Sequence, residues 1–132
     1  MSVTQTASRS AADAEVDPRP RFGIGHLSMP ADDVDRVTEF YTSIGMRLVV
    51  TMGRMSILEL RGGTHLIVHR GESGGGSLDL IVDDIDETRA VLAAAGGNPS
   101  SIERGSPHDR FTATDPEGNV LVVNSNHAIG PV

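Results

Sequence analysis

A repeated stretch decides the fold: His26-Leu27-Ser28-Met29-Pro30-Ala31-Asp32-Asp33-Val34-Asp35 recurs fifty-one positions later as Ser77-Leu78-Asp79-Leu80-Ile81-Val82-Asp83-Asp84-Ile85-Asp86. Each copy has a short, mainly apolar strand followed by an acidic pair that can cap a helix. A second echo links residues 63–69 to residues 118–124, so the second copy is about four residues longer. Two copies of one supersecondary unit are expected to pack together, because neither can bury its apolar face alone. We expect a ligand in the cleft between them.

Both modules predict the order β-α-β-β-β. Short runs rich in apolar and β-branched residues are separated by glycine-containing turns, as is typical of strands. The predicted strands lie at 22–29, 47–52, 55–60, 64–70, 77–82, 100–103, 110–114 and 120–125. We expect Pro30 to stop the first strand, because proline cannot donate to a β-ladder. The pattern predicts an α+β domain in which two curved mixed sheets surround a cleft.

One helix is predicted in each module, over about 33–44 and 84–95. Apolar residues recur at helical spacing in both segments. Each segment has an aspartate pair before it that can act as an N-cap and a glycine after it that can end a helix. These signals are Asp32 or Asp33 with Gly45 in module one, and Asp83 or Asp84 with Gly96 in module two.

The length and composition describe one domain with a leader. A chain of 132 residues can build one sizeable core. Residues 1–21 are rich in Ala, Ser, Thr and Asp and predict a disordered leader, with a strand exchanged onto a partner as the alternative. The single domain then covers residues 22–132. Within it, module one is expected at 22–71, a glycine-serine linker at 72–76 and module two at 77–126.

Several functions are excluded by residues that the chain lacks. Without cysteine there are no disulfides, no thiolate catalysis and no cysteine zinc site. All eleven basic residues are arginine, which excludes a Schiff-base lysine and a P-loop lysine. The net charge of −7 disfavours nucleic acid and anionic membranes as partners. With no membrane-spanning run and no signal-peptide pattern, we expect a cytoplasmic protein.

The paired modules resemble a known group of proteins. The segment Phe40-Tyr41-Thr42-Ser43-Ile44-Gly45-Met46 and the turn Asp115-Pro116-Glu117-Gly118-Asn119 are similar to those of the vicinal oxygen chelate superfamily. This superfamily includes glyoxalase I, bleomycin-resistance proteins, extradiol dioxygenases and methylmalonyl-CoA epimerase. The resemblance covers residues 22–126 and implies a homodimer that binds a small molecule. It does not imply one reaction, because one fold hosts many chemistries.

The resemblance also implies where a metal would bind in the metal-dependent members. One ligand would come from the first strand and one from the last strand of each module. These positions fall on His26 and Ile67 in module one, and on Ser77 and Val122 in module two. Isoleucine and valine have no donor atoms, and a neutral serine hydroxyl is a poor ligand. We therefore expect no tightly bound metal and no other cofactor.

Two further histidines leave a divalent metal as the alternative. His65 and His69 would share one ion on a helix, but the apolar run between them favours a strand. On a strand they point the same way but lie ~13 Å apart. At most one of His65 and His69 could join His26 and Asp79 in a non-standard ligand set.

Three functions follow from these residues. The first is a metal-free ligand-binding or resistance-type protein, with a cleft lined by His26, Ser28, His65, Ile67, His69, Ser77, Asp79 and Val122. The second is a small enzyme in which His26 or Asp79 acts as general acid or base. The third is a metal-dependent lyase, isomerase or dioxygenase with an unusual ligand set around His26. We favour the first, a glyoxalase/bleomycin resistance-like small-molecule protein with a degenerate metal site. Few aromatic residues are present, which argues against bleomycin itself as the ligand.

Overall fold

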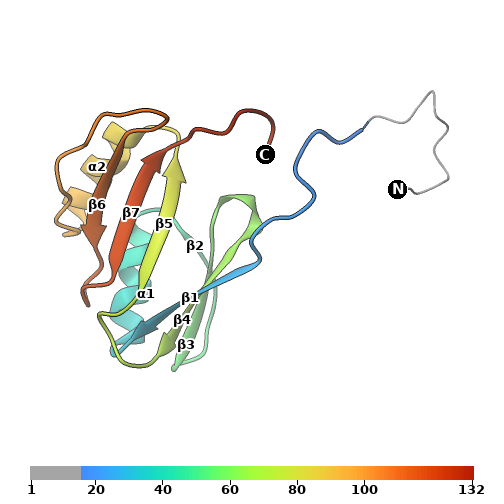
Figure 1. The fold of residues 1–132 in the computed structure, drawn as a ribbon. Helices are drawn as coiled ribbons and strands as arrows, with labels where there is room; N and C mark the ends of the chain where they lie inside the picture. Colours follow the sequence, from blue (N-terminus) through green and yellow to red (C-terminus); the bar gives the residue numbers. More distant parts are fainter. Residues whose placement is uncertain (1–15) are drawn as a thin grey trace, which may run out of the picture.

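Two small mixed sheets, each accompanied by one helix, make up the domain (Figure 1). The computed structural model describes residues 16–132, so most of the predicted leader lies outside the described residues. Sheet A contains β1 (His26–Ala31), β4 (His65–Arg70), β3 (Met55–Glu59) and β2 (Arg47–Thr51), in that spatial order. Sheet B contains β5 (Ser77–Val82), β7 (Val120–Ser125) and β6 (Arg110–Thr114). The helices are α1 (Val34–Ser43) and α2 (Ile85–Ala94), and a 3-10 turn, η1 (Arg61–Gly63), joins β3 to β4.

The internal repeat is confirmed by the way each sheet is paired. In both modules the first and last strands run parallel, β1 beside β4 and β5 beside β7. The remaining pairs, β2 with β3, β3 with β4 and β6 with β7, are antiparallel. The predicted α+β class, with two mixed sheets and two helices, is therefore confirmed.

The predicted helices and their end signals are also confirmed. The Asp33 carboxylate accepts a hydrogen bond from the Arg36 backbone N–H at 3.1 Å, and Asp84 caps α2 in the same way. Gly45 and Gly96 follow the two helices with φ of +119° and +83°, a region that glycine enters without steric cost. Neither helix of the described chain is long and apolar enough to cross a membrane.

The first strand differs from the prediction at both ends. It begins at His26 rather than at residue 22, because residues 22–25 have no β-pairing beyond isolated contacts with Thr64 and His65. It also continues through Pro30 instead of stopping there. β1 is an edge strand of sheet A, and proline is tolerated on an edge strand, where its nitrogen need not serve a ladder. The Pro30 carbonyl accepts a hydrogen bond from the Asn119 side chain at 3.3 Å.

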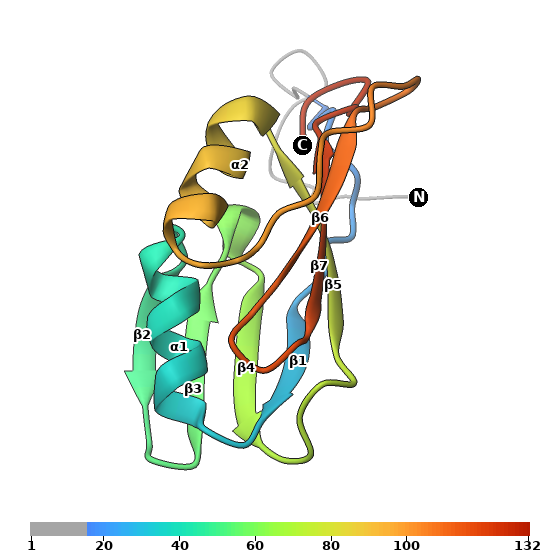
Figure 2. The same ribbon diagram turned by 90° about the vertical axis from the view of Figure 1, so that its left-hand side faces the viewer.

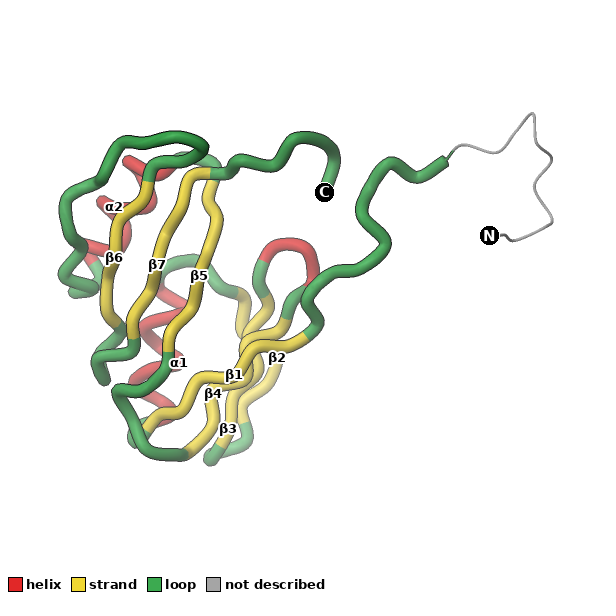
Figure 3. Tube along the Cα trace, viewed as in Figure 1, coloured by secondary structure: helices red, strands yellow, loops and turns green. Residues whose placement is uncertain are grey.

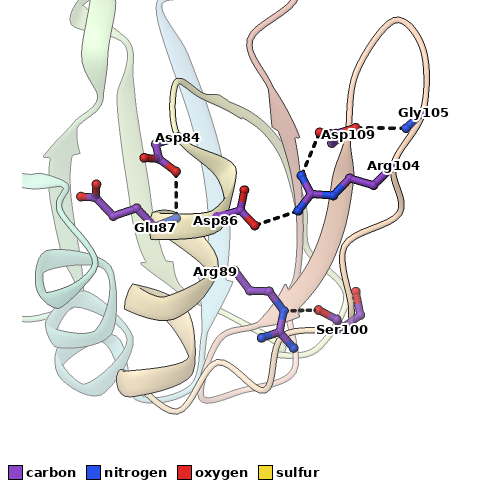
Figure 4. A network of polar contacts seen from close by, with 8 residues as sticks. All are labelled: Asp84, Asp86, Glu87, Arg89, Ser100, Arg104, Gly105 and Asp109. Atoms are coloured by element: carbon purple, nitrogen blue, oxygen red, sulfur yellow. Dashed lines mark hydrogen bonds and ion pairs between the residues drawn. The ribbon is translucent and has the colours of Figure 1, made fainter.

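The second strand of module two, predicted at 100–103, is wrong. The segment makes an isolated bridge between Glu103 and Arg110 and one further backbone hydrogen bond, from the Ser100 N–H to the Thr112 carbonyl at 2.8 Å. It does not form a strand, so sheet B has three strands (Figure 3). Side chains hold the loop against α2 in place of a ladder (Figure 4). Arg104 bridges Asp86 and Asp109 at 2.8 and 3.0 Å, and Arg89 donates to the Ser100 carbonyl at 2.7 Å.

One core is shared by both modules. Its buried side chains come from both helices and from one face of each sheet, and they form a single cluster: Met29, Ala31, Val34, Val37, Phe40, Tyr41, Leu58, Leu66, Val68, Leu78, Ile85, Leu92, Phe111, Ala113, Leu121 and Val123. Both helices lie in the angle between the two sheets (Figure 2). Because strand side chains alternate, the opposite faces of the sheets point away from this core. We call them open face A and open face B; they point in diverging directions.

A buried polar contact joins the two modules. The Asp115 carboxylate, in the turn between β6 and β7, accepts a hydrogen bond from the Tyr41 hydroxyl of α1 at 2.8 Å. In the same turn the Glu117 carboxylate accepts from the backbone N–H groups of Asp32 and Asp33, both at 2.6 Å. An anion there satisfies free donors at the start of α1 and lies at the favourable end of its dipole. The turn therefore fixes module two against α1.

Candidate functional site

Open face A carries a polar row beside an apolar row. The strand register places four residues in one line across the sheet: His26, His65, Glu59 and Arg47, from β1, β4, β3 and β2. The next line contains Ser28, Ile67, Ile57 and Val50. The face thus offers hydrogen-bonding groups at one end and apolar surface beside them.

The polar row is a chain of contacts. The rings of His26 and His65 have centroids 5.8 Å apart. His65 Nε2 lies 3.1 Å from Glu59 Oε2, and the Arg47 guanidinium pairs with the other Glu59 oxygen. The Arg47 guanidinium, and after it His65, lower the pKa of Glu59 from its ordinary value. An ionised carboxylate can only accept, so a neutral His65 carries its proton on Nε2 and presents the Nδ1 lone pair.

Open face B carries both polar and apolar side chains. Asp79 lies on it between Ser77 and Ile81, and the Asn124 side-chain amide donates to Asp79 Oδ1 at 2.6 Å. Ile81 is 47 % exposed and Val120 is 38 % exposed. Pairing with β7 places Arg110, Thr112 and Thr114 of β6 on the same face. The face is therefore a mixed surface, whose one carboxylate accepts a hydrogen bond from Asn124.

All eight residues predicted to line the site lie on the open faces. His26, Ser28, His65, Ile67 and His69 belong to face A, and Ser77, Asp79 and Val122 belong to face B. The structure brings His26 and His65 together, because they are partners in the parallel register. It leaves His69 two rows away, opposite Pro30, and it leaves Asp79 on the other sheet.

The expected metal positions do not fit an ion. Ile67 and Val122 have no donor atoms, and Ser77 and Val122 lie on the face that diverges from that of His26 and Ile67. The alternative set of His26, Asp79 and one of the other histidines is not assembled either. Across residues 16–132, no three His, Asp or Glu side chains lie close enough together to hold one ion.

Two residues of the open faces were missed in the sequence. Arg47 completes the polar row, and Asn124 orients Asp79. The hairpin around Gly53, which has a φ of +73°, is the signal for Arg47, since pairing across it sets Arg47 opposite Glu59. Asn124 gave no such signal, because its partner is forty-five positions away in the sequence.

Two shallow hollows elsewhere in the described chain contain none of the predicted residues. One, of about 400 Å³, lies between α1 and β2 and is lined by Asp35, Thr38, Glu39, Thr42, Ser43, Leu48 and Thr51. The other, of about 340 Å³, lies at the start of α1 and is lined by Asp32, Asp33, Val34, Asp35, Gly53 and Arg70. Both are open to solvent and neither has an imidazole, so the open faces remain the better candidate site.

The arrangement of paired modules is that of a known protein family. The family model of the glyoxalase-like domain matches residues 26–124, from the start of β1 almost to the end of β7. The chain belongs to this family. The resemblance to the vicinal oxygen chelate superfamily is thereby confirmed. No curated protein matches the sequence.

Solved structures of the family have the same fold. A lactoylglutathione lyase from Agrobacterium tumefaciens is 21% identical, with a TM-score of 0.71; the match covers 84% of this chain and 98% of that one. TnmS3, an antibiotic binding protein from Streptomyces sp. CB03234, is 23% identical with a TM-score of 0.71, covering 79% and 95%. A bleomycin resistance determinant encoded on the transposon Tn5 is 21% identical with a TM-score of 0.67, covering 81% and 100%. At these identities the likeness shows the fold alone.

Proposed function

We propose that the protein binds a small organic molecule in a cleft made by two copies of the chain, without a tightly bound metal. Open face A of one copy lies opposite open face B of the other. The observation that carries the proposal is the shared core, which turns the two faces away from each other within one chain. A ligand that touches both faces therefore needs a second copy.

Exposed apolar side chains on both faces support this pairing. Ile81 and Val120 on face B are 47 % and 38 % exposed, and Val50 on face A is 37 % exposed. Covering these side chains with a second copy would remove apolar surface from water, which favours association. A twofold axis pairs face A with face B twice, so a dimer has two equivalent clefts.

The side chains of the two faces suit a ligand with an apolar body and a few hydrogen-bonding groups. Ile67 and Val122 supply apolar contact, while His26, His65 and Asp79 supply donors and acceptors. Among the structural neighbours, one is described as an antibiotic binding protein and another as a bleomycin resistance determinant. These descriptions support a small-molecule ligand for this chain.

A dye that fluoresces on apolar surfaces, anilinonaphthalene sulfonate, tests the proposal on the full chain. We expect Ile67→Arg and Val122→Arg each to weaken dye binding strongly, because each removes one wall of the cleft. Val91→Arg is the matched control, since Val91 is a 36 % exposed valine on α2, away from both faces. Undiminished dye binding in both face variants would contradict the proposed site.

The oligomeric state and His26 give two further checks. Sedimentation should show a species of twice the 13.9 kDa chain mass at micromolar concentration. Once a ligand has been found, His26→Ala should weaken its binding by about 1–3 kcal/mol, the usual cost of leaving a buried polar group unpaired. A protein that sediments only as a monomer would contradict the two-copy cleft.

A further inference from the structure

We infer that His26 and His65 form a binding site for one exchangeable divalent transition-metal ion, with Glu59 orienting His65 from behind. The site differs from the four expected metal positions, of which it uses only His26. It lies entirely on open face A, so it does not depend on the two-copy cleft.

The distance between the two rings matches a shared ion. A zinc–nitrogen bond is about 2.0–2.1 Å, which places the centroid of a bound imidazole roughly 3.2 Å from the metal. Two such rings at a tetrahedral angle would have centroids about 5.2 Å apart, and in a linear arrangement about 6.4 Å. The observed separation of 5.8 Å lies between these limits.

The backbone holds the two histidines in this relation. His26 and His65 are register partners on the adjacent parallel strands β1 and β4, so their side chains leave the same face side by side. The His65 side chain is 32 % exposed. An ion can therefore approach from solvent without displacing the core.

Glu59 gives His65 the form that a metal needs. Metal-ligating histidines usually donate their second ring N–H to a carboxylate or carbonyl, which fixes the tautomer and raises the basicity of the free nitrogen. His65 Nε2 lies 3.1 Å from Glu59 Oε2, and its Nδ1 is left as the ligand atom. Arg47 lies on the far side of Glu59 and balances the charge of that carboxylate.

The donor set selects the kind of ion. Imidazole nitrogen suits copper, nickel and zinc, whereas magnesium prefers oxygen ligands. Structural and catalytic zinc sites normally use three or four protein ligands. With two protein ligands, the ion exchanges with solvent.

The test is calorimetric titration of chelator-treated full-length protein with Ni²⁺, Zn²⁺ or Mg²⁺. We expect one Ni²⁺ or Zn²⁺ ion per chain and no heat from Mg²⁺. His26→Ala and His65→Ala should each remove binding, and Glu59→Gln should weaken it by about 10–100-fold, as second-shell changes do. Melting curves of the variants establish that they are folded.

Two histidine variants are matched controls. His69→Ala removes another histidine of face A. His127→Ala disrupts a second histidine pair, His108 and His127, whose stacked rings have centroids 4.8 Å apart. Neither should change the titration. The inference would be overturned if the protein bound neither Ni²⁺ nor Zn²⁺, or if the stoichiometry were one ion per two chains. It would also be overturned if His127→Ala lost binding while His65→Ala retained it.

A measurement on the unaltered protein supports the assignment independently. Substoichiometric Ni²⁺ is paramagnetic and should broaden the ring NMR signals of His26 and His65 before those of His69, His108 and His127. Equal broadening of all five histidines would overturn the inference. Failure of the dye experiment with success here would reject the two-copy cleft and leave the metal site standing.

Discussion

The contact between Tyr41 and Asp115 should contribute strongly to the stability of the domain. Tyr41 is fully buried and Asp115 is 4 % exposed. The carboxylate accepts four hydrogen bonds, from the Tyr41 hydroxyl, the Glu117 backbone N–H, and both the backbone and the side-chain amide of Asn119. Every acceptor position faces a donor, so none of these bonds can be exchanged for water.

Asp115→Asn has nearly the same shape but replaces one acceptor oxygen by a donor. Whichever way the new amide points, one or two buried donors lose their acceptor, at about 1–3 kcal/mol each. We expect a loss of about 2–5 kcal/mol in the free energy of unfolding. Tyr41→Phe leaves no unpaired donor and should cost about 1.5–3 kcal/mol, the value of a hydrogen bond to a charged group.

Urea unfolding followed by circular dichroism measures these losses, with protein concentration held constant because a dimer is expected. Asp17→Asn is the matched control: Asp17 is exposed in the segment before β1 and should leave stability unchanged. The double variant should lose less than the sum of the single variants, with a coupling of about 0.5–3 kcal/mol. Strict additivity, or a Tyr41→Phe variant as stable as the wild type, would refute the contact.

Three further predictions concern packing, pH and the leader. Gly76→Ala should destabilise the protein by about 1–3 kcal/mol, since the added Cβ would lie 2.2 Å from the buried Met29 sulfur. Gly75→Ala is the control in the same urea assay and should be neutral, because a Cβ at residue 75 would have no atom within 4 Å. Burial, followed by the charge of Asp115, raises the pKa of Tyr41, so stability should fall as the pH rises above about 10, where the tyrosine of the unfolded chain ionises. The chain has one tyrosine and no lysine or cysteine, so Tyr41→Phe should remove this alkaline loss, and its persistence would contradict the assignment. Deleting residues 1–20 should leave the melting temperature unchanged, and a drop of several degrees would mean that the leader packs on the domain or its partner.

Elements specified by local signals were predictable from the sequence. Both helices carried an aspartate cap and a terminal glycine, and β5, β6 and β7 were bounded by turns, so these elements lie within a residue of the predicted positions. The strand predicted at 100–103 failed because its place beside β6 is decided by distant side chains. Arg89 and Arg104 hold the loop against α2, and no local pattern shows that.

The sequence predicts on which side of a sheet each site residue lies, but not which of these residues contact one another. Alternation along the strands puts His26, His65 and Asp79 on the outer side of their sheets once the strands are known. Which residues meet depends on register between segments far apart in the chain. That register selects His65 rather than His69 as the neighbour of His26, and it sets Glu59 behind His65.

Cross-linking tests the two-copy cleft most directly. The chain has no cysteine, so Ile67→Cys and Val122→Cys each introduce a single reactive thiol. The two variants are mixed, allowed to exchange subunits, and treated with bismaleimides of increasing span. We predict a covalent dimer in the mixture that neither variant forms alone, because residue 67 of one copy faces residue 122 of the other. Absence of this dimer at every span, together with an efficient intrachain cross-link in a chain carrying both substitutions, would contradict the account.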